Sequence, residues 1–299
     1  MMVAITGATG MVGSALRAHL ERTGCTVRTL GRGRSAPVDI AWDPMHGVLE
    51  PSALVGVGAI VHLAGETIGQ RWTTNARRRI RESRVRGTQL IAETIAGMDD
   101  ASRPRALISM SAVGCYGDRG EELLDDSSVP GQGFLAEVVR AWEHAAEPAV
   151  RAGVRVVHPR MGVVLHGGGG MLGRLLPIFR MGLGGRVGSG RQFLSWISID
   201  DAVAGIDFLL RSADLHGAVN LTSPEPVTNA RFTEALGSVL HRPVMATVPA
   251  LAIRLLLGDM GEELLLGGQR AVPRTLEAAG FRFAHPSIEG ALRAAIAND

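Results

Sequence analysis

The chain has 299 residues, 46% of them hydrophobic, and its 31 basic and 29 acidic residues leave a formal net charge of +2. A chain of this length can bury a full core, and no apolar run reaches the ~20 residues that a membrane-spanning helix needs. Cys25 and Cys115 are too few for a disulfide framework, and the first predicted strand lies where a signal peptide would stand. We therefore expect a cytoplasmic, soluble protein without a membrane partner.

The chain opens on a short apolar strand, Val3 to Thr6, that leads into a glycine-rich turn. Gly7, Gly10 and Gly13 follow at three-residue intervals, and an amphipathic helix starts among them. Gly7 permits a tight turn, Gly10 lets the backbone approach a pyrophosphate, and Gly13 lets the helix pack closely on the strand. Because the N-terminus of that helix then faces the phosphates, this pattern favours a dinucleotide-binding turn over a glycine turn without a ligand.

Strand and helix signals alternate through the first half of the chain. Strands are predicted at 26–30, 59–63, 106–113, 154–157 and 161–165, and helices at 75–96 and 134–152. This alternation predicts an α/β fold, a doubly wound Rossmann sheet of parallel strands with helices on both faces.

After the glycines at 167–170 the order is less regular. A helix is predicted at 171–181, a glycine-rich turn at 182–190 and a return strand at 218–221, and the rest is mainly helical. We expect an NADP-binding Rossmann domain over residues 1–165, with a return segment near 202–223. Residues 166–299 would then form a smaller, mainly helical substrate lobe.

The second predicted strand ends at Leu30, near the place where a dinucleotide-binding fold usually has an acidic residue for the adenosine ribose. The segment reads Leu-Gly-Arg-Gly-Arg and has no acid, so Arg32 stands close to that place. A guanidinium can bind a 2′-phosphate with two hydrogen bonds, whereas a carboxylate would repel it. The sequence therefore favours NADP over NAD, unless Arg32 is only a surface residue of an arginine-rich chain.

Longer motifs resemble the extended or atypical short-chain dehydrogenase/reductases, a group that includes the nucleotide-sugar epimerases. They are T-G-A-T-G-M-V-G, H-L-A-G-E, S-M-S-A-V-G-C-Y-G and S-W-I-S-I-D-D. G-L-G-G-R-V-G-S-G-R-Q and N-L-T-S-P-E-P-V-T-N are similar to a narrower subfamily, the NAD-dependent epimerase/dehydratase-like proteins of unknown substrate. The resemblance spans essentially the whole chain and implies a small C-terminal domain at about 245–295.

The resemblance implies roles for individual positions. Ser111 stands in the position of the family's active-site serine and would hydrogen-bond a substrate oxygen. The implied cofactor-binding residues are Gly7, Thr9, Gly10, Met11, Val12 and Gly13 at the pyrophosphate, Leu63, Ala64, Gly65 and Glu66 at the adenine and ribose, and Pro159, Arg160 and Met161 at the nicotinamide.

One expected feature of the wider superfamily is missing. There a tyrosine and a lysine stand four residues apart on the helix after the serine strand, and the cation lowers the phenol pKa for proton exchange. Here Phe134 or Leu135 takes the tyrosine position, and the chain contains no lysine. Tyr116, the only tyrosine, is the catalytic candidate that remains beside Ser111, with Glu66 or a bound water as alternative proton donors.

Other chemistries find little support. The arginine-rich run at 77–86 lies on a predicted helix without interleaved aromatic residues, which favours a solvated face over nucleic-acid binding. The nine histidines show no zinc-ligand spacing, so no metal site is expected, and no Gly-x-Ser-x-Gly motif is present.

Two functions stay open. The leading one is an NADP(H)-dependent oxidoreductase or epimerase-like enzyme that acts on an unidentified small molecule. The alternative is a non-catalytic NADP(H)-binding redox sensor, which the loss of the tyrosine–lysine pair favours. If the chain assembles, a homodimer is the expected form.

Overall fold

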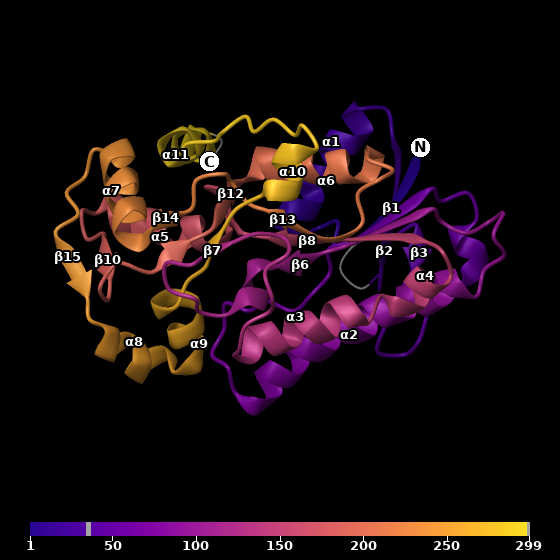
Figure 1. Ribbon diagram of the computed structural model, residues 1–299, viewed down its shortest axis with the longest axis horizontal. Coiled ribbons are helices and arrows are strands. Elements are labelled where there is room, and N and C mark those ends of the chain that lie inside the picture. The colour runs from indigo at the N-terminus through magenta and orange to yellow at the C-terminus, as the bar shows by residue number, and fades with distance from the viewer. Residues whose placement is uncertain (34–36, 298–299) are drawn as a thin grey trace.

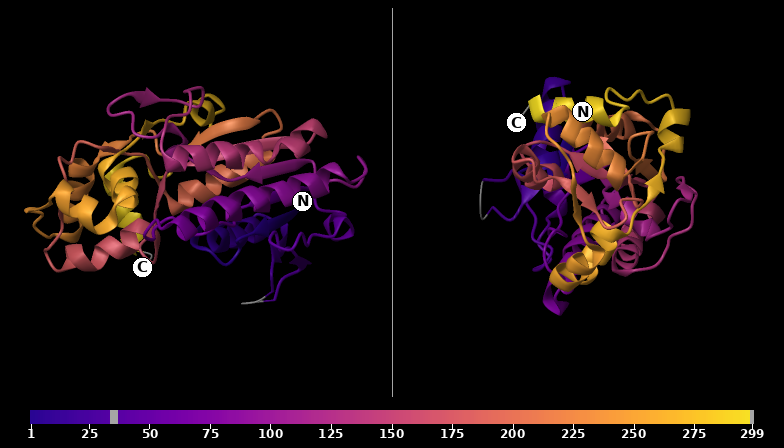
Figure 2. Two further views of the ribbon diagram at one scale, coloured as in Figure 1. Left: turned by 90° about the horizontal axis from the view of Figure 1, so that it is seen from below. Right: turned by 90° about the vertical axis from the view of Figure 1, so that its left-hand side faces the viewer.

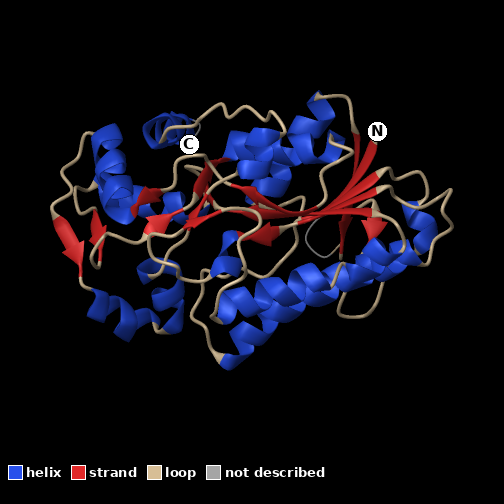
Figure 3. Ribbon diagram, in the orientation of Figure 1, coloured by secondary structure: helices blue, strands red, loops and turns tan. Residues whose placement is uncertain are grey.

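A large parallel sheet with helices on both faces organises the molecule, in a computed structural model that describes residues 1–33 and 37–297 (Figures 1 and 3). The strand order is β13-β8-β5-β4-β1-β2-β3, and β6 pairs with β8. In that order the strands are β13 (Gly217–Leu221), β8 (Arg155–Met161), β5 (Ala106–Ser109), β4 (Ala59–His62), β1 (Met2–Thr6), β2 (Thr26–Gly31) and β3 (Ile40–Ala41), with β6 at Ser111–Ala112. Every pair in this sheet is parallel. The predicted doubly wound Rossmann sheet is confirmed.

Helices cover both faces of the sheet. They include α1 (Met11–Arg22) and α6 (Ile199–Arg211) on one face, and α2 (Thr74–Ala96), α3 (Phe134–His144) and α4 (Glu147–Arg151) on the other. The left view of Figure 2 shows α2 and α3 running side by side. α6 begins where the Ser198 side chain accepts a hydrogen bond from the Asp201 backbone N–H, which is a standard N-cap. The predicted return segment therefore supplies α6 and β13.

The core lies on both faces of the sheet. Ile5 of β1 packs with Leu16 of α1 and Ile206 of α6, whereas Ala4 of the same strand packs with Ile91 of α2. Val3 to Ile5 are fully buried, as expected for a parallel strand that helices cover on both sides.

Most of the rest of the chain forms a smaller part at the left of Figure 1, while α10 lies over the large sheet beside β13. The remaining helices are α5 (Gly170–Arg180), α7 (Asn229–Leu240), α8 (Ala250–Leu257), α9 (Asp259–Gly261), the π-helical turn η3 (Glu262–Leu266), α10 (Arg274–Ala278) and α11 (Ile288–Ala297). Short strands pair as β9 (Val163–Leu165) with β12 (Trp196–Ser198), β10 (Gly185–Val187) with β15 (Ala246–Val248), β11 (Phe193–Leu194) with β14 (Val227–Thr228), and β7 (Leu123–Leu124) with β16 (Arg270–Ala271). The 3-10 turns are η1 (Pro51–Leu54) and η2 (Val113–Tyr116).

The single strand predicted over 106–113 is wrong, because the structure breaks it between β5 and β6. The break at Met110 lies opposite Pro159 of β8, between the pairs Ile108–Val157 and Ser111–Arg160. Proline has no N–H for the ladder, so the interruption coincides with the position where β8 cannot donate. The Met110 N–H instead donates to the carbonyl of His62.

The single helix predicted over 134–152 is also wrong. α3 ends at His144 and α4 starts at Glu147, with Pro148 in its first turn. Proline is accepted in a first helical turn but not in a helix interior, so Pro148 divides the helix. This division places Glu143 next to the C-terminal end of α3.

Within the residues that the structure describes, no helix has the length and apolarity required to span a bilayer.

Candidate cofactor and active site

The predicted cofactor residues meet at one edge of the large sheet, where its parallel strands end. Gly7 follows β1, Leu63 follows β4, and Met161 ends β8. The strand order reverses between β1 and β4, and doubly wound sheets bind ligands in the crevice at such a switch point. The topology thus gathers residues that lie far apart in the sequence.

At two positions of this switch point, Gly7 and Gly13, neighbouring backbone atoms lie so close that a residue with a Cβ does not fit. Gly7 has φ +67°, and a Cβ on it would lie 3.0 Å from the Ala64 nitrogen. A Cβ on Gly13 would lie 2.1 Å from the Gly7 carbonyl oxygen. Gly10 differs, because its Cβ would meet only that oxygen at 3.3 Å, so the space in front of Gly10 is open. The three glycines therefore have distinct roles.

The N-terminus of α1 suits a pyrophosphate. Gly10 is its N-cap, no side chain caps the helix, and its first turn carries no acidic residue. The first N–H groups of a helix lack intrahelical partners and carry partial positive charge, so a phosphate fits here without displacing a resident group. Met11 and Val12 in this turn are half-buried, and Thr9 is exposed. The residues present fit a dinucleotide.

A buried hydrogen-bond group supports the switch point from behind. The Thr6 hydroxyl oxygen accepts from the backbone N–H groups of Leu63 and Ala64 at 3.0 and 3.1 Å. The same hydroxyl lies 2.7 Å from Nδ1 of His62, which is fully buried. Burial, with the nearby charge of Arg84, lowers the pKa of His62 to about 3. This imidazole is therefore neutral at pH 7 and holds the ends of β1 and β4 in register.

Arg32 lies at the same edge of the sheet. β1 and β2 pair in the register Thr6–Leu30, so Arg32, two residues beyond Leu30, stands level with the start of the glycine turn. Its side chain is exposed. Arg34, in the same segment, falls outside the described residues.

Glu66 and Gly65 lie beside a half-buried arginine. Nη1 of Arg84 donates to the Glu66 carbonyl at 2.9 Å, and its guanidinium stacks 5.1 Å from the Trp142 ring centre. Burial lowers the pKa of Arg84 to about 10. The Glu66 carboxylate itself accepts from Gln70 Nε2 at 3.0 Å. The same carboxylate oxygen also lies 3.6 Å from Nε of Arg79, so this oxygen already has two partners.

Ser111 is joined to an ion pair that the sequence did not suggest. Its hydroxyl donates to Oε1 of Glu143 at 2.6 Å, and Arg160 donates to both oxygens of that carboxylate, Nε at 3.0 Å and Nη2 at 3.1 Å. Burial alone would raise the pKa of Glu143, but the Arg160 guanidinium and the serine hydroxyl together lower it below its ordinary value. Glu143 is therefore a carboxylate, and the hydroxyl oxygen of Ser111, a residue that is 3% exposed, keeps its lone pairs for a further partner.

Tyr116 lies behind this ion pair. It is fully buried, and its hydroxyl lies 2.7 Å from Asn220 Oδ1 and accepts from Arg160 Nη1 at 3.1 Å. Burial raises the pKa of the Tyr116 phenol, so the phenol keeps its proton at pH 7. This setting argues against direct proton delivery from Tyr116 to a substrate and favours a role in positioning Arg160.

The three predicted nicotinamide-side residues lie at the end of β8. Pro159 is buried, the Arg160 guanidinium points to Glu143 and Tyr116, and Met161 is half-buried. Met161 pairs with Ala112, one residue after Ser111. Of the three, Met161 is the side chain available at the sheet edge.

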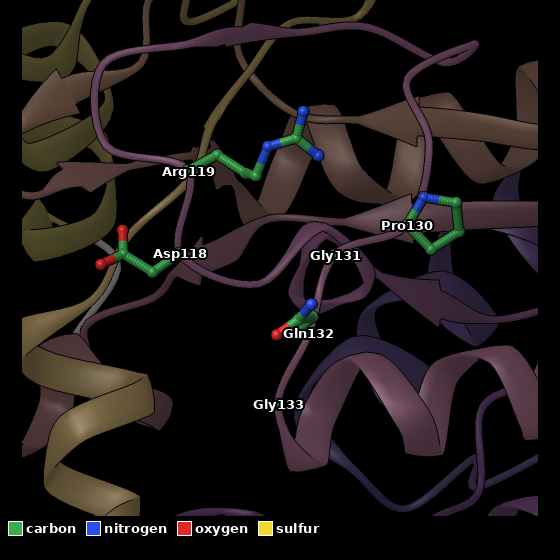
Figure 4. A pocket seen from close by; sticks show the side chains of 6 residues that line it. All are labelled: Asp118, Arg119, Pro130, Gly131, Gln132 and Gly133. Atoms are coloured by element: carbon green, nitrogen blue, oxygen red, sulfur yellow. The ribbon is translucent and has the colours of Figure 1, made fainter.

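The start of α3, at Phe134 and Leu135, faces an acidic side chain from the C-terminal part of the chain. The backbone N–H groups of Phe134 and Leu135 donate to the two oxygens of Glu263 at 2.9 and 3.0 Å. Beside this contact a pocket of about 560 Å³ opens between the loops before α3 (Figure 4). Its lining residues are Asp118, Arg119, Pro130, Gly131, Gln132 and Gly133.

Glu143 and Glu263 were not among the sequence candidates. Glu143 and Arg160 are 17 positions apart on a helix and a strand, and Glu263 lies 129 positions from Phe134. Neither spacing forms a motif, so only the folded chain brings these groups together. Among residues 1–33 and 37–297, no three His, Cys, Asp or Glu side chains are grouped so that they could hold a metal ion.

The sequence of this chain is similar to those of known protein families and of individual relatives. Residues 3–221 match the model of the NAD dependent epimerase/dehydratase family, and residues 248–295 match a domain of unknown function, DUF1731. The epimerase family protein MT2273 of Mycobacterium tuberculosis is 43% identical over 97% of this chain and 96% of its own length.

Solved structures agree with the fold along the whole chain. The crystal structure of human epimerase family protein SDR39U1 (isoform 2) with NADPH superposes with a TM-score of 0.90 at 32% identity, and the match covers 100% of both chains. A nucleoside-diphosphate sugar epimerase from Corynebacterium glutamicum gives a TM-score of 0.82 at 38% identity, and covers 99% of this chain and 58% of that one.

Proposed function

The chain belongs to the NAD dependent epimerase/dehydratase family, and on that premise we propose that it is an NADP(H)-dependent oxidoreductase or epimerase-like enzyme for a small molecule. The observation that carries the proposal is the uncapped N-terminus of α1 at the switch point, with Gly10 open in front of it and Arg32 level with it. The NADPH in the human relative supports the same cofactor. The proposal includes a cytoplasmic location, which two buried free thiols favour, and a homodimer.

In this proposal the cofactor supplies a hydride, and the chain's own residues hold it in place. The first-turn N–H groups of α1 bind the pyrophosphate, and Arg32 binds the 2′-phosphate. Leu63 to Glu66 line the adenine and ribose, and Met161 borders the nicotinamide end.

Ser111 is the residue that we assign to the substrate. Because its proton is donated to Glu143, the hydroxyl can accept a hydrogen bond from a substrate alcohol. Donation to a substrate carbonyl requires the hydroxyl to rotate away from Glu143. A group that orients a reacting oxygen in this way contributes ~10²-fold or more to turnover.

We expect Arg32 to decide which cofactor binds. NADPH should bind at least ~10-fold more tightly than NADH, a difference of about 1.4 kcal/mol, because only NADPH carries the phosphate that a guanidinium can bind. Calorimetric titration of both cofactors measures this preference, and Arg32→Ala should abolish it. Arg22→Ala, at the opposite end of α1, is the matched control. Equal affinities in the wild type would contradict this assignment.

Turnover should depend on Ser111 more than on Tyr116. Screening NADPH oxidation against carbonyl and enone compounds should identify a substrate class, and Ser111→Ala should then lower kcat by ~10²-fold with NADPH affinity unchanged. Tyr116→Phe should have a smaller effect, since the phenol is buried behind Arg160. Turnover untouched by Ser111→Ala would remove the assigned role.

The second candidate function is a redox sensor that binds NADP(H) without turnover. The absent tyrosine–lysine pair and the buried Tyr116 favour it. Tight NADPH binding without oxidation of any compound in the panel, together with a cofactor-dependent change of shape, would establish the sensor.

A further inference from the structure

A short segment of the C-terminal part lies across the start of α3. It runs from Asp259 to Leu266, through α9 and η3. Both oxygens of the Glu263 carboxylate accept backbone N–H groups of the first α3 turn, at 2.9 and 3.0 Å. A carboxylate at a helix N-terminus is favoured by the helix dipole, so this contact fastens the segment to the Rossmann part.

Gly133 makes room for that carboxylate. Its φ is +106°, in the region that favours glycine, and a Cβ on it would lie 3.2 Å from the Glu263 carboxyl carbon. The backbone before α3 is therefore shaped around a side chain from more than 120 positions later in the sequence.

A second charged contact and an apolar patch join the same two parts. Asp259 forms an ion pair with Arg77 of α2, and the Arg77 guanidinium stacks 4.9 Å from the Phe134 ring centre and 5.6 Å from that of Trp72. Met260 and Leu264 pack against the cluster that contains Trp72. The segment thus rests on α2 and α3 through two acids and two apolar side chains.

Glycines bound the segment on both sides. Gly258 precedes it with φ +57°, in the region that favours glycine, and no atom lies within 4 Å of the position of a Cβ. Gly267 and Gly268 follow it, and the Gly268 N–H reaches the carboxylate of Asp118, a residue that lines the pocket of Figure 4. The segment therefore starts at a glycine turn and ends at the edge of that pocket.

We propose that residues 259–266 are a lid over the substrate side of the site, which Glu263 fastens in the closed position. Opening releases the two N–H groups of α3 and the Arg77 guanidinium to water and widens access to the pocket before α3. The proposal rests on the proposed function only in taking that pocket as the substrate side. It gives part of the domain of unknown function at 248–295 a specific role.

Hydrogen exchange and thiol labelling test the lid on the full chain. In Glu263→Ala, protection of the Phe134 and Leu135 amides should fall at least ~10-fold, because they lose their own acceptor as well as the cover of the segment; the thiol reaction reads the opening itself. Leu135→Cys provides a half-buried thiol at the residue whose backbone N–H donates to Glu263. Cys25 and Cys115 are buried, so the reaction of the new thiol with an aromatic disulfide reagent should quicken by a similar factor in the Glu263→Ala background.

Glu262→Ala is the matched control. The Glu262 carboxylate pairs with Arg254 inside the C-terminal part, and not with α2 or α3. Unchanged exchange and labelling in Glu263→Ala, or an equal rise in Glu262→Ala, would overturn the lid. If Glu263→Ala folds poorly, Glu263→Gln gives a milder form of the test, since it keeps the side-chain size and one acceptor oxygen but loses the charge and the second acceptor. NADPH affinity is measured separately by calorimetry. A wild type that fails to bind NADPH contradicts the proposed function, while the labelling result still decides the lid.

Discussion

Replacing Gly10 by valine is expected to lower NADPH affinity by at least ~100-fold, about 2.7 kcal/mol, while the fold survives. Gly10 has φ −77° and ψ 169°, an extended conformation that valine adopts readily. A Cβ there would meet only the Gly7 carbonyl oxygen, at 3.3 Å. The branched side chain would therefore fill the space in front of α1, where the pyrophosphate must approach.

Calorimetry gives the affinity, and circular dichroism with thermal unfolding gives the state of the fold. Ala18→Val, the same kind of change on an exposed position further along α1, should leave binding intact. Gly13→Ala should behave differently, because its Cβ would lie 2.1 Å from a backbone oxygen, and it should lower both stability and binding. Normal NADPH binding by Gly10→Val would mean that the cofactor lies elsewhere.

Removing Glu143 should have the largest effect on stability. Glu143→Ala leaves the Arg160 guanidinium, whose side chain is 7% exposed, without its carboxylate partner. Breaking a buried ion pair from one side typically costs about 3–5 kcal/mol, so Tm should fall on the order of 10 °C. It also frees the Ser111 hydroxyl, so the serine loses its fixed orientation.

Urea unfolding and calorimetry measure this loss against two controls. Glu137→Ala removes an exposed acid from the same helix and should change the stability little. The stability of Glu143→Gln should lie between those of the wild type and Glu143→Ala, because an amide can accept a hydrogen bond but carries no charge.

The stabilisation by Glu143 should also depend on pH. The pKa of Glu143 lies below its ordinary value of 4.5, so its stabilisation is present above that pH and is lost as the pH falls through the lowered pKa. The difference in the free energy of unfolding between the wild type and Glu143→Ala should therefore become smaller in acid. A constant difference would assign the loss to packing rather than to charge.

Local sequence signals were sufficient for the fold class and for the glycine-rich turn after the first strand. Each of these signals is contained in a short stretch of sequence: a few residues for the strand at Val3 and the glycine spacing, and one βαβ unit for the alternation of strands and helices. Gly7 and Gly13 lie in close contact with neighbouring backbone, as the spacing predicts. The helix predicted at 75–96 was confirmed within one residue. The two prolines were the local exceptions: Pro148 divides a predicted helix, and Pro159 lies opposite a break in a predicted strand.

The chemical surroundings of the candidate side chains were decided only by the tertiary structure. Ser111 was identified from its motif, but its partner Glu143 comes from a helix 32 positions away. Tyr116 was a candidate as the only phenol in the chain, yet the fold buries it fully and raises its pKa. The start of α3 holds Glu263, a residue from the far end of the chain. Burial and long-range pairing depend on how whole elements pack, so a sequence can name which side chains carry chemistry, while their neighbours and their exposure follow from the packing of the folded chain.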